Sequence, residues 1–478
     1  MSGADNDAST PTASSSPRLV VLILALVLFM AALDQTVVGT ALPRIAAEIG
    51  GLDWYSWVFA AYLVTTAAVT PVAGKLGDIY GRRRLLAVGV VEFVLSSLLA
   101  GLAPSMEALV VMRALQGVGA GMLAAGALAA LGDLFPPAKL GKYNGMMSGV
   151  YALASLIGPI LGGLITDLVG WRWVFLINLP VGAVALVVVL RRFHPPTRGR
   201  ADAAAEPLDV AGAALLILTL VAALLGISGL ERAIDGSFAL AIGGAAAAIV
   251  LGALFVRVER RAAAPILPLE LLGDGELRRL LALTVVSGAA IYAVGLFTPL
   301  LLQGPLGLSP SAAGLAMTPL VFALVGGGVI GGVRLSRTGR YRRALLVGFV
   351  LAAAGASLLA VAASSPTVAL ICVSLAVVGA GAGISVPLLV SAAQNAVPYA
   401  QLGLATSLSK SARTLGGVIG IGALGSALTL LMIGALGERL PAALGGADEA
   451  LQVALARDPS AILSGDPARA LAELGVEP

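Results

Sequence analysis

Two charged residues lie inside long apolar stretches, where a charge is costly. Asp34 lies within residues 19–45, and Arg113 lies six residues into the apolar stretch 107–131. An ionised Asp at the centre of a bilayer costs roughly 2.5–3.5 kcal/mol, so it normally faces a partner or a water-filled cavity. Because a low dielectric disfavours its ionised form, Asp34 is a candidate for exchanging a proton with a cationic ligand. A structural polar residue bonded to a neighbouring helix is the alternative.

Two further interpretations stay open. Arg113 either faces a central cavity or lies near enough the outer surface to extend its charged end into water. Glu92, inside the apolar stretch 85–103, is either a second proton site or a residue that faces water near the inner surface. A direct pair between Asp34 and Arg113 is not required by the sequence, but in such a pair a proton or substrate arriving at Asp34 would release Arg113.

The composition places these residues in a membrane protein. Of 478 residues, 58% are hydrophobic and 12% are charged, against about 25% charged in globular domains. A single Cys372 and a single His194 exclude a disulfide framework and clusters of Cys or His around a metal. We therefore expect no metal, no cofactor and no enzyme activity, since an intramembrane enzyme needs a nucleophile or metal constellation. The net charge of +4 lies in short loops, so we expect no nucleic-acid partner.

Apolar stretches of about 20 residues predict an all-α polytopic protein of thirteen spans. They lie near 19–41, 55–73, 85–103, 107–131, 143–168, 173–190, 209–230, 238–256, 279–302, 310–333, 344–363, 366–389 and 402–434. With a cytoplasmic N-terminus, 23 Lys and Arg fall on the inside and 6 outside, with Arg113 left within a span. Since cytoplasmic loops carry the excess of Lys and Arg, this predicts the orientation.

An internal repeat predicts how the spans are grouped. GKLGDIYGRRR at 74–84 recurs in weaker form as GVRLSRTGRYR at 332–342, a displacement of 258 residues, and Gly158 and Gly162 match Gly416 and Gly420 at the same displacement. Such repeats are typical of transporters. The predicted parts are a disordered cytoplasmic tail (1–18), a six-helix half (19–192), a cytoplasmic linker (193–208), two inserted spans (209–256), a cytoplasmic loop (257–278), a second half of five spans (279–434) and a polar extracytoplasmic tail (435–478).

The second half lacks a counterpart of the sixth span, because the chain turns polar after Leu436. This predicts either a shortened chain or a natural variant with thirteen spans. From Leu277 to Gly437 the sequence also has no Asp or Glu, so the acidic groups within the membrane lie in the first half.

Three motifs carry a resemblance to a known family. GKLGDIYGRRR (74–84), MRALQGVGAG (112–121) and GPILGG (158–163) resemble the loop, arginine and antiporter motifs of the major facilitator superfamily. Together with LDQTVVGTALPRI (33–45), WRWVFLINLPVG (171–182) and the two extra spans, they make the chain similar to the 14-span drug:proton antiporters of that superfamily.

The resemblance implies roles for single residues. Asp34 and Arg113 would serve proton coupling and substrate recognition. Asp78, helped by Arg82 and by the turn at Gly74 and Gly81, would dock against the facing half and latch the inner gate in the outward-open state. The antiporter motif consists of Gly158, Pro159, Gly162 and Gly163; its small residues allow close helix packing.

The function that the resemblance implies is proton-coupled export of small amphipathic compounds, neutral or monocationic, across the cell membrane by alternating access. The lack of acids in the second half argues against dicationic substrates. We expect a monomer whose partners are the substrate, protons and the lipid bilayer. Export of one endogenous metabolite or lipid is the alternative within transport, and a non-transporting receptor or scaffold on the same fold is the alternative outside it.

Overall fold

The computed structural model describes residues 17–135, 137–193, 209–232, 238–262, 265, 273, 275–338, 341–364, 367–398 and 402–443. Within these residues the secondary structure is helical and no strand occurs. The predicted segments 1–18, 193–208 and 435–478 lie mostly outside the described residues, and the predicted loop 257–278 lies partly outside them. The helices are α1 (Pro17–Ile49), η1 (Leu52–Trp54), α2 (Tyr55–Tyr80), α3 (Arg82–Gly101), α4 (Met106–Leu134), α5 (Pro137–Leu168), α6 (Arg172–Leu176), α7 (Asn178–Arg192), α9 (Val210–Arg232), α10 (Ala239–Glu259), α11 (Gly275–Gln303), α12 (Pro310–Ala316), α13 (Thr318–Thr338), α14 (Arg342–Ser364), α15 (Val368–Asn395) and α16 (Leu402–Ala443).

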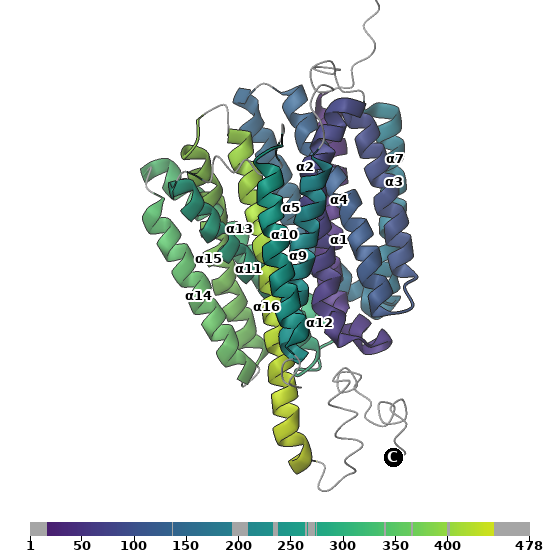
Figure 1. Cartoon of the computed structure of the whole chain (residues 1–478), viewed down its shortest axis with the longest axis vertical. Helices are drawn as coiled ribbons and strands as arrows, with labels where there is room; N and C mark the ends of the chain where they lie inside the picture. The colour runs from purple at the N-terminus through teal and green to yellow at the C-terminus, as the bar shows by residue number, and fades with distance from the viewer. Residues whose placement is uncertain are drawn as a thin grey trace, which may run out of the picture.

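Among the described residues, twelve helical segments are long and apolar enough to cross a membrane. They coincide with the first twelve predicted spans, and the thirteenth, 402–434, lies within α16. The prediction of an all-α polytopic protein is confirmed. Helices α1–α7 form one side of the bundle, here called the N-terminal half, and α11–α16 form the other, the C-terminal half (Figure 1). Helices α9 and α10 lie in front of the seam between them in this view.

Two predicted spans are interrupted where a proline removes a backbone donor. The sixth span is divided at Ile177 into α6 and α7, because Pro180 has no N–H to bond the carbonyl of Leu176. The tenth span is divided at Met317 into α12 and α13. There Pro319 leaves the carbonyl of Leu315 free, and the Thr318 hydroxyl donates to it at 2.7 Å.

The two halves meet closely at the end of the bundle where α5 ends and α12 begins. A Cβ placed at Gly314 of α12 would lie 2.8 Å from the carbonyl carbon of Pro159, and one at Gly163 would lie 2.7 Å from Cα of Ser311. The Asp167 carboxylate accepts hydrogen bonds from the backbone N–H of Ser311, at 2.9 Å, and from its hydroxyl. Gln303 of α11 donates to the carbonyl of Thr40 of α1 at 2.7 Å.

Because of these contacts, we expect Gly314→Ala to keep the N-terminal and C-terminal halves apart at the α5–α12 end of the bundle. The added methyl group would meet backbone atoms of Pro159, which cannot move aside as a flexible side chain can. We expect transport to fall about tenfold or more, as a barrier rise of 1.4 kcal/mol would produce, and cysteines placed along the α5–α12 contact to react faster with an impermeant thiol reagent.

Gly295→Ala is the matched control, because a Cβ at Gly295 of α11 meets nothing within 4 Å. If the two variants behave alike, the close approach of α5 and α12 is not required for transport.

Candidate functional site

Asp34 and Arg113 form a buried ion pair inside the N-terminal half. Nη1 of Arg113 lies 2.6 Å from Oδ2 of Asp34, and both side chains are 0% exposed. The structure therefore brings the two predicted residues together and contradicts the interpretation that Arg113 reaches the outer surface. Burying two charges is favourable only when their remaining polar atoms are also bonded.

Two amide side chains supply further bonds to Asp34, and one hydroxyl group accepts from both amides. Oδ1 of Asp34 accepts from Nε2 of Gln116 at 2.9 Å and from Nδ2 of Asn178 at 2.7 Å. Both amides also donate to the hydroxyl oxygen of Ser97, at 2.5 Å and 3.2 Å respectively. The site thus joins α1, α3, α4 and α7, and we call Asp34, Arg113, Gln116, Asn178 and Ser97 the buried polar network.

Arg113 has a second set of contacts on α2. Its guanidinium carbon lies 4.2 Å from the centre of the Tyr62 ring, and its Nε donates to the carbonyl of Val58 at 3.4 Å. A cation over an aromatic face is attracted by the electron-rich ring. Nη1 also donates to Oε1 of Gln116 at 2.5 Å, whereas the buried Nη2 has no hydrogen-bond partner among the described residues.

Local structure explains how these side chains converge. Gln116 follows Arg113 by three residues on α4, so both point to the same face of that helix. Asn178 is the first residue of α7, directly after the interruption at Ile177. The motifs that carry the resemblance include both residues, and each is an uncharged polar side chain within an apolar span. That signal, together with the spacing from Arg113, could have identified Gln116.

The network surrounds the Asp34 carboxylate with hydrogen-bond donors. Asp34 receives one charged and two neutral donors, and charge-assisted hydrogen bonds are roughly twice as strong as neutral ones. A proton on Asp34 would cancel its attraction to Arg113 and leave a buried guanidinium without its counter-ion. An unpaired buried charge is strongly unfavourable, so each member of the pair depends on the other at this depth.

The antiporter motif packs against the helix that carries Asp34. A Cβ at Gly158 would lie 2.7 Å from Cβ of Thr36, and one at Gly162 would lie 2.5 Å from the carbonyl oxygen of Val37. Glycine at these positions lets α5 approach α1 at backbone distance, as predicted. Pro159 and Gly163 of the same motif contact α12, so the motif lies between the buried network's helix and the C-terminal half.

The loop motif (74–84) forms a second charged cluster. It lies at the end of the N-terminal half opposite the α5–α12 contact. Arg82 donates to the carbonyl of Gly74 at 2.8 Å and to Oδ2 of Asp133 at 3.0 Å, and it also bonds Asp78. Gly81 connects α2 to α3 with φ of 93°, a conformation that glycine adopts without strain. In this structure the partner of Asp78 is thus Arg82, so docking against the facing half stays a prediction for another conformation.

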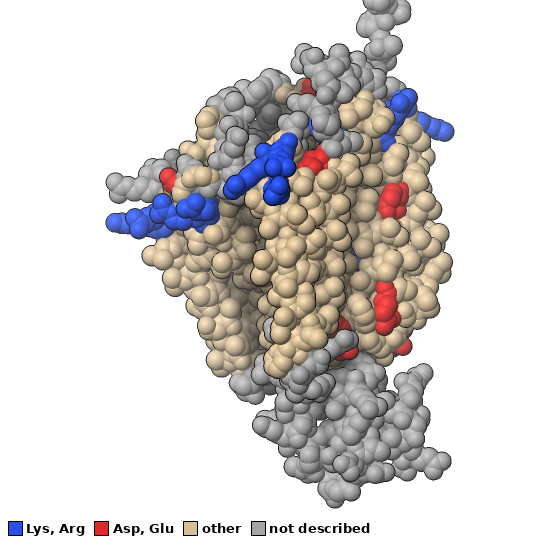
Figure 2. Space-filling model, viewed as in Figure 1, with Lys and Arg blue, Asp and Glu red and all other residues tan. Residues whose placement is uncertain are grey.

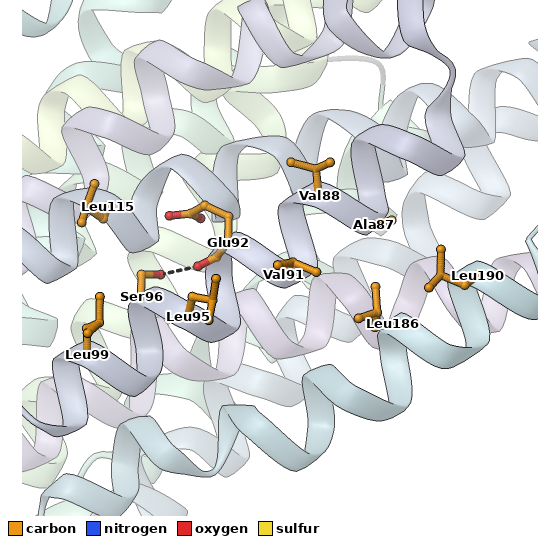
Figure 3. A pocket seen from close by; sticks show the side chains of 10 residues that line it. All are labelled: Ala87, Val88, Val91, Glu92, Leu95, Ser96, Leu99, Leu115, Leu186 and Leu190. Carbon is orange, nitrogen blue, oxygen red and sulfur yellow. Dashed lines mark hydrogen bonds between the residues drawn. The ribbon is translucent and has the colours of Figure 1, made fainter.

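Glu92 is not part of the buried polar network. It follows Arg82 by ten residues on α3, which places it about 15 Å along the helix axis from the helix start. Its side chain lines a separate pocket formed by α3, α4 and α7 (Figure 3). Its mid-span position disagrees with the interpretation that it faces water near the inner surface.

A bundle of membrane-spanning helices in two halves, with a buried ion pair inside one half, is the architecture of a secondary transporter. Sequence comparison identifies the particular family. The sequence model of the Major Facilitator Superfamily matches residues 24–421, so the chain belongs to that family.

Relatives agree with this assignment, and a solved structure has a similar fold. The chain is 35% identical to "Multidrug transporter protein MdtP" of Bacillus subtilis, over 87% of this chain and 76% of the relative. It is 34% identical to the "Probable actinorhodin transporter" of Streptomyces coelicolor, over 86% of this chain and 72% of the relative. A bacterial homologue of the human lysosomal transporter Spinster has a similar fold, with a TM-score of 0.62 at 17% identity over 95% of this chain and 88% of that chain.

Proposed function

We propose that this protein is a proton-coupled antiporter that exports small amphipathic compounds, neutral or monocationic, across the cell membrane, and that it works as a monomer. The observation that carries the proposal is the buried polar network, in which one carboxylate is paired with one guanidinium away from solvent. The relative named "Multidrug transporter protein MdtP" supports export of several compounds.

In the proposed cycle, the described conformation holds Asp34 ionised and paired with Arg113. A proton that reaches Asp34 releases Arg113, which keeps the Tyr62 ring and the Val58 carbonyl as contacts on α2. Because α1 carries both Asp34 and the surface on which the antiporter motif packs, a shift of α1 is transmitted to the α5–α12 contact. Proton uptake and the opening of that end are thereby coupled.

Surface charge supports the orientation that we propose for the cycle. On the face drawn in Figure 2, Lys and Arg side chains gather toward the upper end, opposite the end at which Figure 1 labels α12. Since Lys and Arg favour the cytoplasmic side, the upper end is inside and the N-terminus is cytoplasmic. The closed α5–α12 contact then lies on the outer side, and the described conformation is closed to the outside.

Export of a single endogenous product is a second candidate. One relative, the "Probable actinorhodin transporter" of Streptomyces coelicolor, is named for a single compound. Both candidates use the same proton-coupling site. They differ in how many different compounds compete for substrate binding. A competition panel separates them: several unrelated compounds inhibit a multidrug exporter, whereas one compound and its close analogues inhibit a dedicated one.

The experiment that tests the proposed function is transport in proteoliposomes with an imposed pH gradient. We expect a lipophilic monocation such as ethidium to accumulate against its gradient, and a protonophore to abolish this accumulation. Transport that persists at full rate after the protonophore would show that the protein moves substrate without proton coupling.

The loop motif gives a prediction of its own. Asp78→Asn should lower turnover about tenfold while leaving substrate affinity within a factor of two, because a latch changes the rate of exchange between conformations and not the binding site. Turnover is measured in proteoliposomes and affinity by equilibrium binding.

Asp133→Asn is the control, since Asp133 also bonds Arg82 but is not part of the loop motif. Equal losses in the two variants would mean that Asp78 only anchors Arg82 within its own half.

A further inference from the structure

A pocket of about 470 Å³ opens on the side of the N-terminal half, away from the buried polar network. Helix α3 supplies most of its lining, with Leu115 from α4 and Leu186 and Leu190 from α7 (Figure 3). Apart from Glu92 and Ser96, its lining side chains are apolar. Two of them, Val88 and Leu95, are more than half exposed, so the pocket opens toward the lipid.

One carboxyl group lies within this apolar lining. Oε2 of Glu92 is buried and lies beside the backbone N–H of Gly119, and no side chain among the described residues donates a hydrogen bond to it. It lies in the space left by Gly119 of α4, where an added Cβ would also come within 2.9 Å of Cβ of Phe93. Ser96 turns away from it, because its hydroxyl donates to the carbonyl of Glu92, at 2.9 Å, and to that of Phe93.

Glu92 and the buried polar network face different directions. Glu92 and Ser97 are five residues apart on α3, so they point to different sides of the helix. No basic side chain in the described part of the chain forms an ion pair with Glu92. A carboxyl at this depth is costly when ionised, and a mobile cation from the bilayer would supply the missing partner.

We propose that this pocket binds a lipophilic organic amine that enters from the bilayer. The ammonium group donates a hydrogen bond to Glu92, and the apolar body occupies the space between α3 and α7. The volume lies within the range of 300–1,000 Å³ typical of sites for drug-sized ligands. The site is separate from Asp34, and its existence does not depend on the proposed proton coupling.

The test measures how fast Glu92 reacts with dicyclohexylcarbodiimide, an apolar reagent for carboxyl groups within membranes, in wild-type protein held in phosphatidylcholine nanodiscs. The modified peptide is quantified by mass spectrometry. The probe is N,N-dimethyl-1-pyrenemethylamine, a tertiary amine that the activated carboxyl cannot acylate. At ten times its half-saturating concentration we expect it to slow the reaction about tenfold, because about a tenth of the sites stays free. At the same concentration the neutral isostere 1-isobutylpyrene should slow the reaction about twofold or less, because loss of a charge-assisted contact of about 1.4 kcal/mol weakens binding about tenfold.

Asp34→Asn is the control for binding at the central site, and protection by the amine should persist in it. Three results would overturn the proposal. No protection by the amine, or equal protection by both compounds, would indicate an apolar groove for lipid alone, and loss of protection in Asp34→Asn would place the amine in the central site. Failure of this test leaves proton-driven transport by the wild-type protein unaffected, so it is distinguishable from failure of the proposed function.

Discussion

Asp34→Asn should abolish transport driven by a pH gradient, with a loss of about 100-fold or more, equivalent to roughly 2.7 kcal/mol in the barrier. Asparagine keeps the size of the side chain and can still accept from Gln116 and Asn178, but it neither binds a proton near neutral pH nor pairs with Arg113. The measurement is the initial rate of substrate accumulation in proteoliposomes with an imposed gradient.

The same variant should retain exchange of labelled for unlabelled substrate without a gradient, because that reaction needs no net proton movement. Glu107→Gln is the matched control, since Glu107 is an exposed acid on α4, the helix that carries Arg113. Gradient-driven accumulation at the wild-type rate in Asp34→Asn would assign coupling to another residue.

Arg113→Leu should be the most destabilising single substitution in the N-terminal half. It leaves the Asp34 carboxylate buried without a counter-ion, and breaking a buried pair from one side costs about 3–5 kcal/mol. The loss is measured as the change in the free energy of unfolding in mixed detergent micelles. Arg44→Leu is the comparison, because Arg44 pairs with Glu48 on an exposed surface, where such a pair contributes below about 1 kcal/mol.

The double variant Asp34→Asn with Arg113→Leu separates the ion pair from lost packing. We expect it to be more stable than Arg113→Leu alone, with a coupling free energy of about 2 kcal/mol, since the buried carboxylate is then no longer charged. Additive effects of the two substitutions would mean that the pair makes no energetic contribution beyond its separate contacts.

The sequence was sufficient for the helical class, the first twelve spans and the charged residues that define the site. Long apolar stretches report directly on membrane helices, and a charge inside one is costly enough to indicate a site. The small residues of the antiporter motif also pack as their spacing predicted. Gly416 repeats this packing in the C-terminal half, where its Cβ would lie 2.7 Å from the carbonyl carbon of Val285.

The partners of the charged pair could not be predicted in the same way. Gln116, Asn178 and Ser97 are uncharged, so their presence in an apolar span is cheap and gives a weak signal. Their convergence depends on the orientation of α3, α4 and α7 about their own axes. It also depends on the interruption of the sixth span at Ile177. The direction of Glu92 was likewise open, because its position in α3 does not determine which side of the helix faces lipid.

The most direct test of proton antiport adds substrate without an imposed pH gradient. Wild-type protein is reconstituted into liposomes that contain a pH-sensitive dye, with no initial pH gradient, and substrate is added outside. Antiport predicts that protons leave the lumen as substrate enters, so the lumen becomes alkaline, and that Asp34→Asn shows no such change. Substrate entry with an unchanged lumenal pH, or with acidification, would contradict the assignment of this protein as a proton antiporter.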